Sequence, residues 1–85
     1  MDKLKSDFEL NVNYVNNLTE KPSDDILLSL YGFYKQATVG NVNKSRPSLF
    51  SMKDRAKWDS WNANKEMSKE EAMQGYINLV KEKNL

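Results

Sequence analysis

Apolar residues in the first third of the chain recur at the spacing of a helix. Five of them are separated by four, four, three and three residues, which places them on one helical face: Leu4, Phe8, Val12, Val15 and Leu18. This pattern predicts a helix over residues 3–17. A second helix is predicted from residue 24 to about residue 37, because Ser23 is a good N-cap and the acidic Asp24 and Asp25 suit a helix N-terminus.

The second half of the chain contains a long connection and two further helical patterns. Residues 38–50 are rich in Gly, Asn, Ser and Pro, which disfavours regular structure. A helix is predicted over residues 52–61, and Ser68 and Glu71 have the spacing of a capping box that opens a fourth helix. Its apolar face consists of Ala72, Met73, Tyr76, Ile77 and Val80. No strand-like alternation interrupts these patterns, so we expect an all-α, four-helix fold forming a single domain over residues 1–85.

The second predicted helix is apolar on two sides. One face carries Ile26, Leu30, Phe33 and Ala37, and the nearly opposite face carries Leu27, Leu28, Tyr31 and Lys35. Burial on both sides is one interpretation. A surface groove with an apolar floor and a cationic end is the other, and it avoids the cost of burying an unpaired lysine ammonium.

Aromatic and basic residues on the third and fourth predicted helices can likewise be interpreted either as ordinary core and surface residues or as parts of a binding site. Lys53 and Lys57 are four residues apart and share one side of a helix. Two such lysines usually form a solvated face, and we expect at least one of Trp58 and Trp61 to be a core residue. Tyr76 suits either the core or a surface on which a ring stacks.

The composition argues against several classes of function. The chain has 85 residues, of which 39% are hydrophobic and 29% charged, as in folded globular domains. Thirteen basic against 12 acidic residues give a net charge of +1, so no overall field attracts nucleic acid. Histidine and cysteine are both absent, which removes the commonest catalytic and metal-ligating side chains. We therefore expect no enzyme, no metal site and no cofactor, and we interpret the carboxylates as solvated helix faces and caps.

The N-terminal segment alternates charged with single apolar residues and lacks the apolar core of a signal peptide. No stretch approaches the roughly 18 apolar residues of a membrane span. We expect a cytoplasmic protein.

Several motifs resemble those of one known family. They are Tyr31–Gly40, Arg46-Pro47 in the connection, Ala56–Asn62, and Glu71-Ala72-Met73 followed by Tyr76. In this order and spacing they resemble the acyl-CoA-binding protein family, also known as diazepam-binding inhibitor, over about residues 8–81. The resemblance implies an up-down-down-up bundle that binds one long-chain fatty acyl-CoA without covalent chemistry.

The resemblance also implies roles for individual residues. Tyr31, Lys35 and Lys57 match positions that hold the 3′-phosphate of CoA, and Tyr76 matches the aromatic beside the adenine and ribose. Leu27 and Leu28 match positions that line the acyl groove. We expect Tyr34, inside the first motif, to pack and to form a hydrogen bond. Two departures, Asn16 for a basic residue and Asp54 for a small one, imply somewhat weaker phosphate affinity.

The function implied by the resemblance is that of an intracellular carrier and pool buffer for acyl-CoA. Such a protein is expected to be a monomer with transient contacts to membranes and acyl-CoA-using enzymes. The alternative is a regulatory module whose main partner is another protein. A thioesterase is disfavoured because the sequence offers no evident pair of nucleophile and base.

Overall fold

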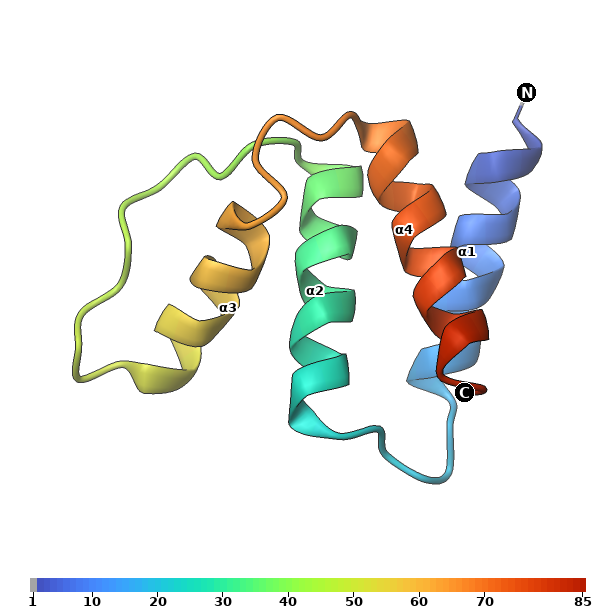
Figure 1. The fold of residues 1–85 in the computed structure, drawn as a ribbon, viewed down its shortest axis with the longest axis horizontal. Coiled ribbons are helices and arrows are strands. Elements are labelled where there is room, and N and C mark those ends of the chain that lie inside the picture. Colours follow the sequence, from blue (N-terminus) through green and yellow to red (C-terminus); the bar gives the residue numbers. More distant parts are fainter. Residues whose placement is uncertain (1) are drawn as a thin grey trace.

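The structure, a computed structural model, describes residues 2–85. This part of the chain contains four helices. They are α1 (Lys3–Asn16), α2 (Asp24–Thr38), α3 (Met52–Asn62) and α4 (Lys69–Glu82), and no strand occurs between residues 2 and 85. α1 and α4 run in one direction and α2 and α3 in the other (Figure 1). The all-α, up-down-down-up prediction is therefore confirmed, with helix ends within about a residue of those expected. Met1, part of the predicted domain, lies outside the described residues.

The helix starts follow the local signals in the sequence. The Ser23 hydroxyl accepts a hydrogen bond from the backbone N–H of Ile26 at 3.4 Å. At α4, the Ser68 hydroxyl accepts from the N–H of Glu71 at 3.0 Å, and the Glu71 carboxylate accepts from the N–H of Ser68 at 2.9 Å. Both predicted caps are confirmed, and each satisfies backbone donors that a helix start leaves free.

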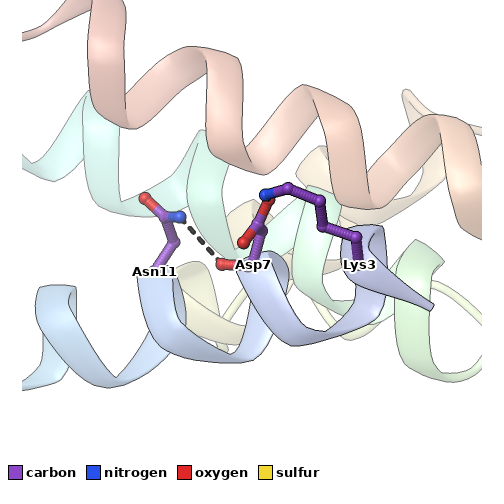
Figure 2. Close-up of polar contacts among 3 residues, drawn as sticks. All are labelled: Lys3, Asp7 and Asn11. Carbon is purple, nitrogen blue, oxygen red and sulfur yellow. Dashed lines mark hydrogen bonds and ion pairs between the residues drawn. The ribbon is translucent and has the colours of Figure 1, made fainter. Parts of the chain in front are cut away.

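α1 begins without a side-chain cap and is supported by contacts one turn apart. The Lys3 ammonium pairs with the Asp7 carboxylate at 2.9 Å, and the Asn11 amide donates to the backbone oxygen of Asp7 at 2.8 Å (Figure 2). An exposed pair of this kind contributes about 0.3–0.5 kcal/mol. Packing of the opposite, apolar face must therefore supply most of the stability of α1.

The core forms where α4 packs against both α1 and α2. α2 also packs against α3, whereas α1 and α2 have no close backbone contact although both are fully described. The buried residues of the core come from α1, α2 and α4: Phe8, Leu30, Ala37, Ala72, Tyr76, Ile77 and Val80. The predicted apolar faces are thus confirmed. Contacts between α1 and α2 are made by side chains only, as in the stacking of Phe8 on Tyr34.

The long connection between α2 and α3 is fastened to α3. Arg46 donates two hydrogen bonds to the carboxylate of Asp59, at 2.9 and 2.8 Å. The indole N–H of Trp58 donates to the backbone oxygen of Lys44 at 2.8 Å, and that of Trp61 donates to Gly40 at 2.7 Å. The hydrogen bond from Arg46 holds the pKa of Asp59 below its ordinary value. Trp61 is buried, which confirms that at least one tryptophan belongs to the interior.

Gly32 allows α2 and α3 to approach closely. A Cβ atom at this position would clash with the backbone oxygen of Ser60, a group that cannot rotate away. In a free helix, Gly→Ala stabilises by about 1 kcal/mol. We expect the opposite sign here, with Gly32→Ala lowering the free energy of unfolding by about 2 kcal/mol in urea titrations because the helices are forced apart.

Gly75→Ala is the matched comparison for this prediction. Its Cβ would meet the ring of Phe33 at 2.6 Å, and a side chain yields more readily than a backbone. We expect a smaller loss of stability for Gly75→Ala than for Gly32→Ala. A Gly32→Ala protein as stable as the original would contradict the assigned close contact.

Each helix within residues 2–85 is too short or too polar to span a lipid bilayer.

Candidate functional site

A groove of about 610 Å³ runs between α2 and α3. Four of the predicted site residues line this α2–α3 groove, namely Leu27, Leu28, Tyr31 and Lys57. The remaining lining residues are Lys21, Asp24, Met52, Lys53 and Ala56. The volume lies within the range of small-molecule sites. Leucine side chains at one part of the wall and lysines at another give it both an apolar surface and a cationic one.

A second cavity of about 370 Å³ lies between α1 and α2, and we call it the α1–α2 cavity. It is lined by two predicted site residues already present in the groove, Leu27 and Tyr31, and by a third, Tyr76. The other lining residues are Val12, Val15, Asn16, Leu30 and Tyr34. Because Leu27 and Tyr31 belong to both, the two hollows adjoin at this turn of α2. The groove interpretation of the second face of α2 therefore describes the structure better than burial on both sides.

Two lysines on neighbouring helices each lie over an aromatic ring of the other helix. The Lys57 ammonium on α3 is 5.4 Å from the ring centre of Tyr31 on α2. One turn further along both helices, the Lys35 ammonium on α2 is 4.9 Å from the ring centre of Trp61 on α3. The crossed pairs follow from the parallel course of α2 and α3, which keeps positions 31 and 57, and then 35 and 61, at matching heights.

These crossed pairs leave both cations available to an anion. Neither ammonium forms an ion pair with a carboxylate anywhere in residues 2–85. Each aromatic face orients its lysine and stabilises the charge by about 0.5–2 kcal/mol, and more so for Lys35, whose partner Trp61 is buried. Lys35 lines neither of the two hollows. It lies beside them because it is one turn of α2 from Tyr31, which lines both.

Tyr76 is a core residue that also forms a wall of the α1–α2 cavity. Its side chain is 4% exposed, and its ring meets that of Phe8 edge to face with centres 5.3 Å apart. Burial, together with the nearby Tyr34, raises the pKa of Tyr76 to about 12. Its hydroxyl therefore stays neutral near neutral pH and adds no negative charge to the site. The core role that the sequence left open is therefore confirmed, while the role as a surface on which a ring stacks stays a prediction.

Tyr34 and the two departures from the family pattern differ in their relation to the site. Tyr34 stacks on Phe8 with ring centres 6.1 Å apart, which confirms its predicted packing, but its hydroxyl forms no hydrogen bond within residues 2–85. Asn16 does line the α1–α2 cavity, so a neutral side chain stands where a basic one would face the cavity. Asp54 is exposed and lines neither hollow.

Some lining residues were not singled out from the sequence. Val12 and Val15 were predicted as part of the apolar face of α1 but not as cavity residues. They line a cavity because α1 and α2 have no close backbone contact. Lys21 precedes α2, and no periodicity would assign it to a groove. Met52 and Ala56 could have been found from their spacing of four residues in α3, which places them one turn apart beside Lys53 and Lys57.

Comparison with known proteins is consistent across sequence and structure. The family model described as Acyl CoA binding protein matches residues 5–80. Acyl-CoA-binding domain-containing protein 6 of Arabidopsis thaliana is 57% identical over 79 residues, covering 93% of this chain and 86% of the relative. The crystal structure of Oryza sativa Acyl-CoA-Binding Protein 2 superimposes with a TM-score of 0.86 at 48% identity, covering 93% of this chain and 88% of that one. The crystal structure of ACBP from Moniliophthora perniciosa gives 0.88 at 41% identity, covering 96% and 79%. The chain belongs to the acyl-CoA-binding protein family.

Proposed function

We propose that this protein binds one long-chain fatty acyl-CoA non-covalently and acts as a cytoplasmic carrier and pool buffer for such esters. The observation that carries the proposal is the position of Tyr31. It lies at the junction of an apolar groove and an aromatic-walled cavity, with a lysine ammonium over its ring. An acyl-CoA ester has matching parts: a fatty chain, an adenine nucleotide, and a 3′-phosphate on the ribose of that nucleotide, which lysine ammonium groups can bind.

The parts of the ligand are assigned to the hollows by their chemistry. The acyl chain occupies the α2–α3 groove over Leu27 and Leu28. The adenine and ribose occupy the α1–α2 cavity beside Tyr76. The 3′-phosphate is held by the ammonium groups of Lys35 and Lys57 and by the Tyr31 hydroxyl, because phosphate oxygens form strong charge-assisted hydrogen bonds. We assign no catalytic step, cofactor or metal ion to this protein.

The carrier role implies a monomer that exchanges ligand with membranes and with acyl-CoA-using enzymes. Both hollows are open at the surface, so the ligand enters without opening the core. Release then depends on the sum of many weak contacts, which suits a protein that buffers a pool and hands its ligand on.

Titration calorimetry with palmitoyl-CoA, below its micelle-forming concentration, tests the proposal. We expect saturation at one ligand per chain. Lys35→Ala is expected to weaken binding about tenfold, because one charge-assisted hydrogen bond to phosphate is lost. Lys53→Ala, which removes the same group from the groove wall without touching the crossed pairs, is expected to weaken it much less.

Urea titrations of both variants serve as the control, since neither lysine forms an ion pair within residues 2–85 and neither should be needed for folding. Absence of saturable binding by the original protein would refute the proposed function. Equal losses for Lys35→Ala and Lys53→Ala would refute the placement of the phosphate.

A further inference from the structure

The connection between α2 and α3 ends in a tight turn whose corners are apolar. The backbone N–H of Ser51 donates to the oxygen of Ser48 at 2.9 Å, and the Ser48 hydroxyl accepts from the N–H of Phe50 at 3.1 Å. Leu49 and Phe50 are therefore the central residues of a β-turn. Turns of this kind usually carry Gly, Pro, Asn, Asp or Ser at their corners.

The side chains at this turn are among the most exposed large apolar groups of the described residues. Leu49 is 71% exposed and Phe50 is 97% exposed, and Met52, the first residue of α3, is 77% exposed. We call these three the apolar tip. The tip lies at the outer corner of the molecule, at the start of α3 and far from α1 and α4 (Figure 1). Single exposed apolar residues are common, but three together on a protruding turn indicate a contact surface.

The apolar tip is continuous with the α2–α3 groove. Met52 belongs to both, and the same groove wall carries Lys21, Lys53 and Lys57 against a single carboxylate, that of Asp24. Three further acidic residues are adjacent in sequence to residues of this wall, Glu20, Asp25 and Asp54, and none of them lines the groove. The mouth of the groove is thus apolar at the tip and mainly cationic beside it.

We propose that the apolar tip inserts Leu49 and Phe50 into an anionic lipid bilayer, so that the α2–α3 groove opens toward the membrane. The inference rests on the function proposed above, because the groove is then the path by which an acyl chain passes from bilayer to protein. Apolar side chains enter the boundary between headgroups and acyl chains, and the lysines lie at the level of anionic headgroups.

A second copy of the chain fits this surface less well than a bilayer does. A stable protein interface requires about 800 Å² from each partner and a complementary shape. Three side chains on a protruding turn provide less area and a convex shape. A bilayer needs no shaped partner surface, and its negative charge complements the cationic side of the groove mouth.

The test is flotation with vesicles of equimolar phosphatidylcholine and phosphatidylglycerol. We expect the original protein to float with these vesicles and more weakly with pure phosphatidylcholine. Leu49→Ser/Phe50→Ser should lower vesicle binding about tenfold, because two apolar side chains no longer enter the bilayer. Leu10→Ser, an equally drastic change at a residue 65% exposed on α1, should leave vesicle binding unchanged.

Titration with palmitoyl-CoA in the absence of vesicles separates this inference from the proposed function. Both the Leu49/Phe50 variant and the original should bind palmitoyl-CoA with equal affinity, since neither residue lines a hollow. Failure of the original protein to bind palmitoyl-CoA would count against the function alone. Four results would overturn the inference: no vesicle binding by the original protein, equal binding to neutral vesicles, equal losses for the tip and Leu10 variants, or a dimer that the tip substitutions dissociate.

Discussion

Palmitoyl-CoA is expected to bind roughly a thousandfold more tightly than free CoA. Each methylene removed from water contributes about 0.8 kcal/mol, so ten of them in the α2–α3 groove contribute about 8 kcal/mol before ordering costs. If ordering the chain and the groove side chains removes about half of this, about 4 kcal/mol remains, or roughly three orders of magnitude. Titration calorimetry of both ligands at one temperature measures the difference.

The groove residues provide a control for this expectation. Leu28 lines the α2–α3 groove but not the α1–α2 cavity, and it is only partly buried. Leu28→Ser should therefore weaken palmitoyl-CoA binding while leaving free CoA binding unchanged. Leu10→Ser should change neither affinity. Equal affinity of the original protein for palmitoyl-CoA and CoA would show that the chain is not held in this groove.

The helices were predictable because their signals are local. Ser23, Ser68 and Glu71 act on backbone groups within one turn, and the apolar spacing of α1 and α4 specifies a face whatever lies opposite. The up-down-down-up order came from the family resemblance. A pattern of faces alone does not say which helix packs on which.

The site was predictable only in part, because it depends on how helices meet. The sequence showed that Tyr31 and Lys35 share a face of α2. It contained no information on the position of α3 along the axis of α2. This position places Lys57 over Tyr31 and Lys35 over Trp61. Gly32, which permits that approach, carried no signal of its own.

Tyr76 shows a different limit of sequence interpretation. Its place on the α4 face predicted contact with the core, and the family match implied contact with a ligand. A buried residue that also lines a cavity is compatible with both, and its burial follows from the packing of α4 against both α1 and α2. The exposure of Leu49 and Phe50 had no sequence signal either, since apolar residues inside a connection are as often packed beneath it.

Palmitate is expected to bind on the order of a thousandfold more weakly than palmitoyl-CoA. It offers the same chain to the α2–α3 groove but lacks the nucleotide. Two charge-assisted hydrogen bonds from Lys35 and Lys57 to the 3′-phosphate contribute about 3–6 kcal/mol together, and a value near 4 kcal/mol corresponds to three orders of magnitude. The adenine contacts beside Tyr76 add to this difference. Calorimetric titration of the two ligands measures it.

The double variant Lys35→Ala/Lys57→Ala shows whether the crossed pairs cause the difference. It should lose most of its affinity for palmitoyl-CoA and change its affinity for palmitate by less than about threefold, because palmitate has no phosphate to hold. Its affinity for 3′-dephospho-palmitoyl-CoA should also change little, which separates the 3′-phosphate from the other phosphates of CoA. Equal affinity of the original protein for palmitate and palmitoyl-CoA would show that the nucleotide contributes nothing to binding. Tight binding of palmitoyl-CoA by the double variant would instead leave the nucleotide in place and assign its phosphate to other cations, with Lys21 and Lys53 on the groove wall the next to test.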